Sequence, residues 1–377
     1  MHHYEKDYAE FTGNVLCEVI ENVNYIKGKY KKESIPISFD FTRHGMVIND
    51  KLSYILFECF CYHLIKNENR RVRISWAPKK EILTEGVFKS SLVYLNKKYD
   101  KNKFLTSFQE NISYEEDDAH FRKVFKSPII KDEYYLSKMQ VEISIFFSTF
   151  NLSETSKNEL IQVCSELIGN TIEHTNSDCL VDIDVTTSHS KYNKNKEKQD
   201  GKFYGINVAI VNFSDKLLYN DVKEKIVGND FEDPRYIDII RAHRNHSGVF
   251  TGEESKTGYT EEHFWCLASM QFGISGRKNT EFYGGTGFHI VLKSLIEKSE
   301  MNNCYVISGD TIIQFKENLI IKKMDQDLVG FNKSNDFIKD VPDKEILKKC
   351  SVFIPGTAYN LNFIMENEEE NNERDRN

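Results

Sequence analysis

The sequence predicts an α/β protein in which a smaller mixed α/β domain precedes a larger α/β sandwich, with helices on one face of a mixed sheet. Two observations predict this class. Apolar residues recur at helical spacing in several long segments, and shorter extended or alternating segments lie between them. The 377 residues, 40% of them hydrophobic and 29% charged, are typical of about two globular domains with a sizeable core.

The N-terminal domain is expected over residues 1–100. Its most regular helix is capped by Asn49 or Asp50, because either side chain can accept a hydrogen bond from the first turn. This helix lies between an extended segment and an alternating one, which predicts a β-helix-β unit. The expected elements are a helix over 8–26, an extended segment over 35–41, a helix over 49–66 and a strand over 71–76.

A polar connector is expected over residues 101–128, and the second domain over residues 129–365. The last residues, 366–377, carry six acidic and two basic side chains, which predicts a disordered acidic tail. The expected elements of the second domain are a helix over 139–147, a helix that starts from a cap at Ser153 or Ser156, and strands over 180–187, 204–212, 303–308, 311–315 and 359–363.

One helix of the second domain carries three polar groups in register. Glu166, Asn170 and His174 follow one another at four-residue steps in an apolar, helix-forming run, so their side chains share one face. The adjoining sector of the helix is apolar and is expected to pack against the core. Each residue alone has an ordinary explanation as a solvated carboxylate, a buried amide or a cation at the helix end. Together they predict an edge that binds a ligand.

A glycine-rich turn opens another helix further along the chain. The turn consists of Gly284, Gly285, Thr286 and Gly287, and Phe288 follows it in the helix. Glycine lets the backbone approach an anion closely, and the unpaired N–H groups at a helix start attract negative charge together with the helix dipole. The turn therefore predicts phosphate contacts, although taken alone it also fits a simple entry into the helix.

The two motifs, in this order, resemble the N-box and the last glycine box of the GHKL nucleotide-binding superfamily, named for gyrase, the heat-shock chaperone, histidine kinases and MutL. The resemblance spans residues of about 130 to 365. It implies that ATP and Mg²⁺ are the cofactors and that Asn170 is the magnesium ligand, with His174 in the same cofactor site. It also implies that Glu166 is the catalytic base of a slow ATP hydrolysis and that residues 284–288 hold the phosphates.

The resemblance places the adenine contact at the end of the strand over 204–212. The family has an Asp followed by two glycines there, whereas this chain has Asn212, Ser214 and Lys216. A carboxamide oxygen can still accept a hydrogen bond from the adenine amino group, and Asp215 is the fallback acceptor. Without the glycines the backbone passes less closely under the base, so the selection of adenine stays open.

A long insertion over residues 218–278 lies where the family carries its lid over the nucleotide. Arg277 and Lys278 lie at its end, shortly before the glycine turn, and are expected to contact a terminal phosphate. A surface salt bridge is the competing role for either side chain. The N-terminal β-helix-β unit is faintly similar to the STAS-type modules that accompany some bacterial proteins of this family.

Charge and composition argue against two classes of protein. A net charge of −8 disfavours broad binding to a nucleic-acid backbone. No apolar run reaches the roughly 20 residues that cross a bilayer, and the N-terminus lacks the hydrophobic region of a signal peptide. The eight cysteines are scattered without C-x-x-C spacing and are expected to be reduced core residues. A cytoplasmic location without membrane contact follows.

The function expected from the sequence is that of a bacterial ATP-binding protein that uses nucleotide as a conformational switch, with slow hydrolysis and a protein partner or a homodimer. One alternative is a protein serine kinase of the anti-sigma type that phosphorylates a STAS-like substrate. The other is a non-catalytic interaction scaffold whose altered adenine box no longer takes nucleotide. A sensor histidine kinase is disfavoured, because the N-terminal region does not resemble a dimerisation hairpin.

Overall fold

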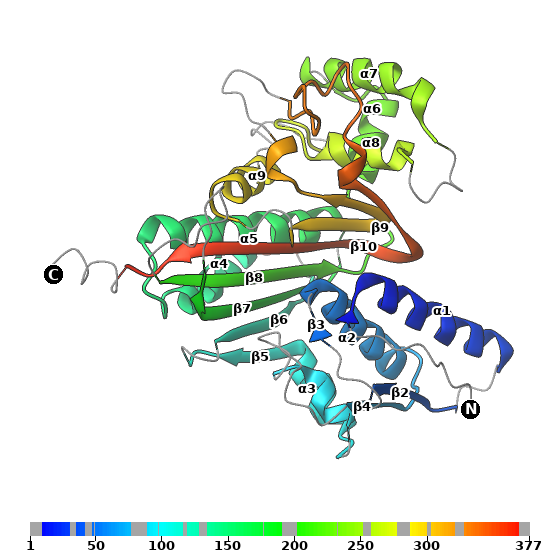
Figure 1. The fold of residues 1–377 in the computed structure, drawn as a ribbon, viewed down its shortest axis with the longest axis vertical. Coiled ribbons are helices and arrows are strands. Elements are labelled where there is room, and N and C mark those ends of the chain that lie inside the picture. The colour runs from blue at the N-terminus through cyan, green and yellow to red at the C-terminus, as the bar shows by residue number, and fades with distance from the viewer. Residues whose placement is uncertain are drawn as a thin grey trace. The chain divides into compact units, whose positions relative to one another are not determined.

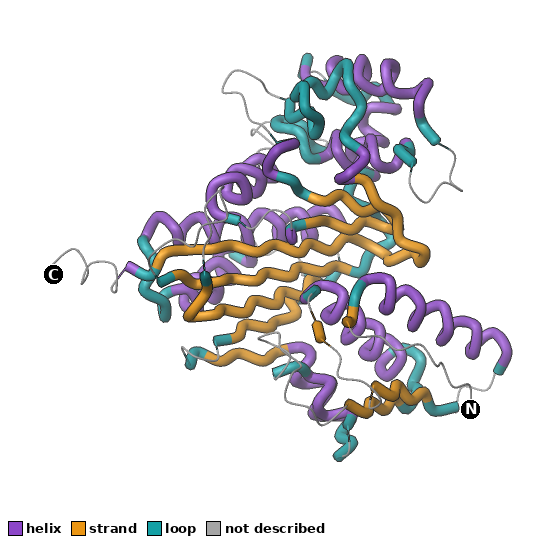
Figure 2. Tube along the Cα trace, viewed as in Figure 1, coloured by secondary structure: helices purple, strands orange, loops and turns teal. Residues whose placement is uncertain are grey.

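In the computed structural model, the chain forms two compact units, drawn in Figure 1 and Figure 2. The first unit consists of residues 1–124 and 180–186, and the second of residues 125–179 and 187–377. The α/β class is confirmed, because helices alternate with a six-stranded sheet and two small parallel sheets among the described residues. The structure describes residues 10–30, 35–41, 47–48, 50–76, 89–96, 98–115, 119–127, 134–175, 177–190, 202–231, 233–251, 258–276, 287–299, 303–320 and 328–368.

The first unit is built around a parallel β-helix-β arrangement. β2 (Ile37–Phe41) pairs in parallel with β4 (Val72–Trp76), and α2 (Lys51–Lys66) lies between them in the chain. Asp50 caps α2, because its carboxylate accepts the backbone N–H of Ser53 at 3.4 Å and the hydroxyl of the same residue at 2.6 Å. The helix, its cap and both strands expected from the sequence are confirmed.

Aromatic side chains fill the core of the first unit. Phe57 of α2 lies between Phe11 and Phe39, with ring centroids 5.4 and 5.1 Å away. α1 packs against α2 and begins at Gly13, after a short strand, rather than at residue 8. The remaining elements of this unit are β1 (Glu10–Phe11), α1 (Gly13–Lys29), β3 (Val47–Ile48), η1 (Ser91–Leu95), α3 (Lys101–Gln109), β5 (Glu110–Ser113) and β6 (His120–Phe125).

The connector expected over residues 101–128 is instead largely regular structure, because it contains α3, β5 and β6. Asp100 caps α3 by accepting the N–H of Lys103 at 3.0 Å. Phe104 and Phe108, one turn apart in α3, are buried, and Phe108 stacks on a tyrosine ring of α2 at 4.2 Å. A helix with so narrow an apolar stripe has mostly polar residues, which is why its composition resembled that of a loop.

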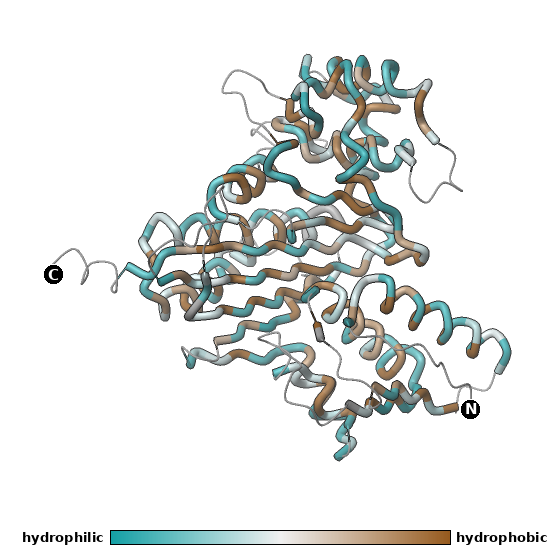
Figure 3. The backbone as a smooth tube through the Cα atoms, viewed as in Figure 1, coloured by the Kyte–Doolittle hydropathy of each residue, from teal (hydrophilic) through white to brown (hydrophobic). Residues whose placement is uncertain are grey.

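The six-stranded sheet has the strand order β5-β6-β7-β8-β10-β9. The pairings of β5 with β6, of β8 with β10 and of β9 with β10 are antiparallel. Apolar stretches run along its central strands in Figure 3. The bounds of the strands not yet given are β7 (Cys179–His189), β8 (Phe203–Asn212), β9 (Tyr305–Gln314) and β10 (Leu347–Glu366).

Helices α4 (Tyr135–Phe147), α5 (Glu154–Thr175) and α9 (Gly287–Lys298) form the helical layer of the second unit. α5 packs against α4 on one side and α9 on the other, and contacts β8, while α9 contacts β10. Figure 1 shows α4 and α5 behind the strands of the unit. The expected arrangement of helices on one face of the sheet is therefore present in this unit. No helix among the described residues has both the length and the apolar content needed to cross a membrane.

Two strand predictions differ from the structure. The two short strands expected over 303–315 are one strand, β9, which passes through Gly309 at a φ of 66°. The strand expected at 359–363 is the middle of the 20-residue β10, and the register shifts between Ile354 and Thr357, where Gly356 has a φ of 83°. In both places a glycine marks a local irregularity inside a continuous strand. The sequence did not predict the continuity, because it depends on pairing with neighbouring strands.

The first three residues of the expected disordered tail, 366–368, are ordered. Glu366 is the last residue of β10, and the backbone N–H groups of Asn367 and Glu368 donate to the carbonyls of Lys202 and Asn151 at 3.0 and 2.9 Å. These hydrogen bonds hold the first residues of the tail in place. Residues 369–377 lie outside the described part of the chain.

The insertion over residues 218–278 contains α6 (Asn220–Val227), α7 (Arg235–His246) and α8 (Glu261–Ser269), grouped together in Figure 1. Phe264 of α8 lies in an aromatic cluster with residues of α7 and with Phe337, to which it is stacked at 5.7 Å. The insertion therefore contains three helices whose aromatic side chains pack together with Phe337 from further along the chain.

Candidate functional site

Helix α5 carries the first motif, and its start is fixed by capping. The hydroxyl of Ser153 accepts the N–H of Ser156 at 3.1 Å, which satisfies a donor of the first turn. Glu166 and Asn170 lie one turn apart and are both half-buried. They thus lie at the boundary between the packed face of the helix and its exposed face. The packed face consists of Leu160, Val163, Cys164, Leu167 and Ile168, all buried.

The direction of α5 places Asn170 near the end of β8. Just before the helix, the N–H of Asn151 donates to the hydroxyl of Tyr204, near the start of β8, at 3.4 Å. Near the other end of the helix, Thr171 lies against Cys179, the first residue of β7. β7 and β8 are antiparallel neighbours, so the start of β7 lies toward the end of β8. α5 therefore runs from the start of β8 toward its end.

Helix α9 runs in the opposite direction. Its second residue, Phe288, packs near Tyr359 of β10, with ring centroids 6.4 Å apart. Ser299, just after the helix, forms an isolated backbone β-bridge with Phe363 of the same strand. Because β10 is antiparallel to β8, the start of α9 lies toward the end of β8. The start of α9 and the C-terminal half of α5 are thus at the same end of these strands.

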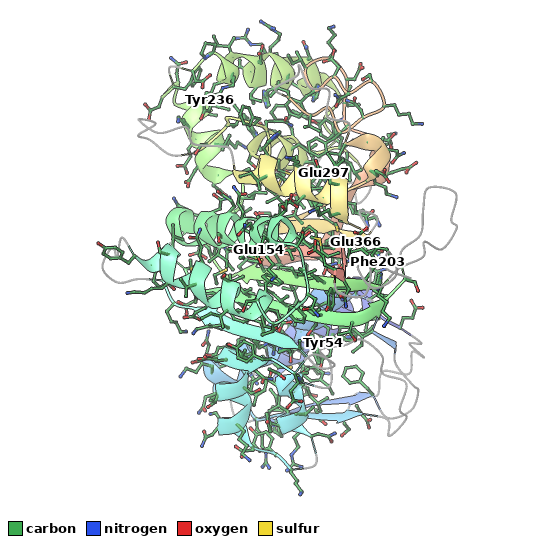
Figure 4. All side chains as sticks on the ribbon, turned by 90° about the vertical axis from the view of Figure 1, so that its left-hand side faces the viewer. Tyr54, Glu154, Phe203, Tyr236, Glu297 and Glu366 are labelled. Carbon is green, nitrogen blue, oxygen red and sulfur yellow. The ribbon has the colours of Figure 1, made fainter. Side chains whose placement is uncertain are left out.

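An ion pair fixes the register between the two antiparallel helices. Nζ of Lys298, in the last turn of α9, lies 2.6 Å from Oε2 of Glu159, near the start of α5. Eleven residues separate Lys298 from Gly287, and eleven separate Glu159 from Asn170, roughly 16 Å of helix in each case. Asn170 therefore lies level with the first turn of α9. Figure 4 faces the opposite end, where Glu154 begins α5 and Glu297 lies near the end of α9.

Asn212 lies at the same end of the sheet, as the last residue of β8. It is buried and pairs with Thr357 of β10, and its carboxamide oxygen accepts the backbone N–H of Thr357 at 2.8 Å. The hydroxyl of Ser308 adds to this polar group by contacting the Thr357 hydroxyl at 3.1 Å. Sequence reasoning missed Ser308 and Thr357, which are single polar residues in strands. Asp215, the fallback acceptor, is exposed.

The second motif is described only from Gly287 onward, which is the first residue of α9. The following predicted residues lie outside the described part of the chain: Gly284, Gly285, Thr286, Arg277 and Lys278. The backbone of His174 is helical, and its side chain is outside the description. The structure thus brings together the described members of the predicted site, Glu166, Asn170, Asn212 and the start of α9, at one end of the sheet.

The chemistry available at this end of the sheet fits an anionic ligand and a hard cation. The first turn of α9 offers backbone N–H groups without intrahelical partners, and the helix dipole adds partial positive charge. Asn170 offers a carboxamide oxygen, and Glu166 a carboxylate one turn away. Oxygen atoms of this kind are the ligands that Mg²⁺ takes, usually with water and phosphate completing its shell.

A separate group of charged side chains lies inside the first unit, and we call it the buried charge cluster. Its carboxylates and basic groups interact directly and are nearly excluded from solvent. Arg122 donates through Nε to Asp182 Oδ2 at 2.5 Å and through its terminal nitrogen to Glu58. Nζ of Lys51 lies 2.7 Å from Asp182 and 2.5 Å from Asp184. The cluster consists of Lys51, Glu58, His120, Arg122, Asp182 and Asp184.

Hydroxyl groups extend the buried charge cluster on the Glu58 side. Ser90 and Ser91 both donate to the same oxygen of Glu58, and the hydroxyl of Tyr54, labelled in Figure 4, donates to Ser90 at 2.6 Å. Burial alone raises the pKa of a carboxyl, but Arg122, Lys51 and His120 hold the pKa of Asp182 well below its usual range. Burial opposes the charged form of Lys51 as well, yet Asp182 and Asp184 leave its pKa raised.

Sequence reasoning missed the buried charge cluster, although one signal pointed to it. In β6, His120 and Arg122 occupy alternate positions, and in β7, Asp182 and Asp184 do the same within an apolar run. Alternate residues of a strand share a face. The two basic groups of β6 therefore face the same side of the sheet as each other, and so do the two acidic groups of β7. The opposite signs of the two pairs indicated that the strands are neighbours, as the sheet order confirms.

No protein-family model, curated protein or solved structure matches this chain.

Proposed function

We propose that the second unit binds ATP with Mg²⁺ at the end of the sheet where α5, α9 and β8 meet, and that nucleotide acts as a conformational switch with slow hydrolysis. The antiparallel register of α5 and α9 carries this proposal, because it sets Asn170 level with the helix start that follows the glycine turn. A cation ligand beside an anion-binding helix start is the arrangement that a magnesium–phosphate complex needs. It is also the arrangement that the resemblance to the GHKL superfamily implies.

Each residue has a defined role in this proposal. Asn170 binds the magnesium ion, and Glu166, one turn earlier on the same edge, positions or deprotonates the attacking water. The backbone of residues 284–288 holds the phosphates, with Arg277 and Lys278 near the terminal one. His174 belongs to the same face of α5. Phosphoryl transfer gains mostly from positioning and charge neutralisation, so slow turnover needs little more.

The proposed adenine contact involves a side chain that is already hydrogen-bonded within the sheet. The carboxamide oxygen of Asn212 already accepts the Thr357 N–H, so an adenine amino group has to use the remaining lone pair. Asp215 is exposed at the following turn and is the second acceptor. The engagement of Asn212 within the sheet favours the second candidate function, an interaction scaffold that has the fold of a nucleotide-binding unit without the ligand.

Titration calorimetry of ATP into the purified protein, with and without Mg²⁺, tests the proposal. Magnesium-dependent binding in the wild type should be lost in Asn170→Ala, because that substitution removes the cation ligand. Asn158→Ala is the matched control, since Asn158 lies on the same helix in an exposed position away from the site, and it should bind as the wild type does. No binding by the wild type supports the scaffold, and tight binding by a folded Asn170→Ala variant contradicts the magnesium assignment.

Turnover is tested separately with Glu166→Gln, which keeps the shape of the side chain and removes its basicity. We expect unchanged ATP binding and at least about a 100-fold loss of phosphate release. Unchanged hydrolysis would show that another group activates water. Transfer of labelled phosphate to a serine of an added partner would instead identify the serine kinase of the anti-sigma type.

Location and partners remain part of the proposal. Seven of the eight cysteines are buried thiols, and burial raises the pKa of Cys164 to about 12. Free thiols of this kind are typical of a reducing compartment, and the bacterial cytoplasm is such a compartment. A protein partner or a second copy of the chain as the receiver of the switch stays a prediction.

A further inference from the structure

The buried charge cluster contains an imidazole nitrogen without a partner. Nδ1 of His120 and Oδ1 of Asp184 lie 2.5 Å apart in a hydrogen bond that fixes the ring. Nε2 is buried, has no hydrogen-bond partner and lies 3.6 Å from Oδ2 of Asp182. His120 as a whole is 2% exposed. A buried polar atom without a partner costs free energy, so it calls for an explanation.

The orientation of His120 is the one found in metal sites. A ligating histidine usually donates one ring N–H to a carboxylate, which leaves a lone pair on the other nitrogen for the metal. With Asp184 accepting from Nδ1, the lone pair of His120 belongs to Nε2. One ligand atom each from His120, Asp182 and Asp184 lie within 4.8 Å of one another. A small rotation of Asp182, whose Oδ2 lies 3.6 Å from Nε2, brings both atoms to the roughly 2.0–2.2 Å from one ion that zinc coordination requires.

The ammonium group of Lys51 marks a position favourable to a cation. It lies 2.7 Å from Oδ1 of Asp182 and 2.5 Å from Oδ2 of Asp184, so it contacts both carboxylates beside His120. Lys51 is the first residue of α2, and its side chain is 10% exposed. Its flexible stem can therefore turn the charge out into solvent, which the guanidinium of Arg122, held between Glu58 and Asp182, cannot do.

Charge balance permits the exchange of this ammonium for a divalent ion. A metal-binding imidazole is neutral, so once the ammonium of Lys51 has left, the carboxylates of Glu58, Asp182 and Asp184 are balanced by Arg122 and the divalent ion. A neutral buried group costs less desolvation free energy than a charged one.

We propose that His120, Asp182 and Asp184 form a binding site for a divalent transition-metal ion, which displaces the ammonium group of Lys51. The ion is bound by Nε2 of His120 and by a carboxylate oxygen of Asp182, while Asp184 accepts from Nδ1 and orients the ring. An imidazole nitrogen among the donors suits Zn²⁺, Mn²⁺ or Fe²⁺ better than Mg²⁺ or Ca²⁺, which prefer oxygen alone. The site lies wholly within the first unit and does not depend on the nucleotide site proposed for the second.

Two variants at one position, compared with the wild type, test the competition between Lys51 and the metal. Full-length, chelator-treated protein is titrated with ZnCl₂ and, separately, with MnCl₂, in the wild type, Lys51→Met and Lys51→Arg. Lys51→Met removes the competing charge and should bind one equivalent at least about ten-fold more tightly than the wild type, whereas Lys51→Arg retains the charge and should bind more weakly. Equal affinities in the three proteins overturn the proposal.

Two further measurements distinguish metal binding at His120 from metal binding by the cysteines and from a cluster that serves only as a network of ion pairs. His120→Gln in the Lys51→Met background should weaken binding by at least about ten-fold, and unchanged binding contradicts the assigned ligand. Co²⁺ bound to the Lys51→Met variant should show no thiolate charge-transfer absorption, and such a band would assign the metal to cysteine instead. If Lys51→Met is unstable, Zn²⁺ must raise its melting temperature, and failure to do so also rejects the site.

Discussion

At the scale of single residues, Arg122 is a buried cation that pairs with two buried carboxylates. It is 1% exposed, and its donors reach Asp182 of a neighbouring strand and Glu58 of α2. Burial opposes its charge, but Asp182 and Glu58 raise the pKa of the guanidinium, so it stays protonated. The residue therefore satisfies two buried carboxylates at once.

Arg122→Ala should lower the free energy of unfolding by about 3–5 kcal/mol, because it leaves two buried carboxylates without their main cation. Urea unfolding followed by circular dichroism measures this change. The matched control is Lys126→Ala, which breaks an exposed ion pair with Asp178 at 2.7 Å and should cost about 0–1 kcal/mol. Similar effects in the two variants would show that the buried cluster is not a special source of stability.

At the scale of elements, the irregularity in β10 depends on one glycine. Gly356 has a φ of 83°, and a Cβ atom there would lie 2.3 Å from both the backbone oxygen and the carboxamide oxygen of Asn212. A side chain at this position is therefore excluded by conformation and by space together. The bend in β10 and the polar group around Asn212 are coupled through this close approach.

Gly356→Ala should destabilise the protein by about 1–3 kcal/mol, since it adds backbone strain and displaces Asn212. Gly248→Ala is the control, because Gly248 has an ordinary φ and nothing lies within 4 Å of its added Cβ atom. The difference between the melting temperatures of the two variants measures the effect. A Gly356→Ala protein as stable as the control would mean that β10 relaxes freely at this point.

The insertion helices contain histidines that the fold keeps neutral. Nε2 of His263 donates to the carbonyl of Lys348 at 3.0 Å, while Nδ1 accepts the N–H of Thr260 at 3.2 Å. A proton on Nδ1 would face a donor and break this cap. Burial lowers the pKa of His263 and of His246, and in His246 the neighbouring His243 lowers it further.

Because the folded pKa values of these histidines lie below the unfolded value of about 6.5, the unfolded state binds more protons as the pH falls. Their contribution to stability is complete above that value and is lost as the pH drops through the folded pKa values. We expect a lower melting temperature at pH 5.5 than at pH 7.5, with a smaller decrease in His263→Gln. An identical decrease in this variant would exclude His263 as a source of the dependence.

At the scale of the whole molecule, the first unit is discontinuous in sequence. It takes in residues 180–186, which supply Asp182 and Asp184 to the buried charge cluster. The separate N-terminal domain expected over residues 1–100 therefore lacks Arg122 and both of the carboxylates that Lys51 contacts.

A fragment of residues 1–124 should consequently fail to fold cooperatively, because Lys51 would lose both of its acidic partners, Arg122 would keep only Glu58, and β6 would lose its neighbour β7. Urea unfolding of the fragment, compared with the full chain, measures this. The fragment with Lys51→Met is the control, because it removes the cation that has lost its partners and leaves Arg122 with Glu58, and it should regain part of the lost structure. A cooperative transition for the unmodified fragment would show that the first unit is independent.

The sequence by itself determined the elements whose signals are local. Capping residues located the starts of α2 and α5, alternation located β4, and four-residue spacing put Glu166 and Asn170 on one edge of α5. These features depend on residues within about one or two turns of each other, so a pattern in the chain suffices to predict them. The α/β class followed from their order.

Only the tertiary structure decided which polar groups meet. Glu58 and Arg122 are 64 residues apart and Arg122 and Asp182 are 60 apart, so no periodicity connects them. The single long strand β10, with its bend at Gly356, likewise depends on pairing with β8 and β9. Lys298 and Glu159 fix the register that sets Asn170 level with the start of α9. Such contacts arise when distant segments pack, because burial makes charge pairing and strand pairing necessary there, and local sequence carries no record of the partner.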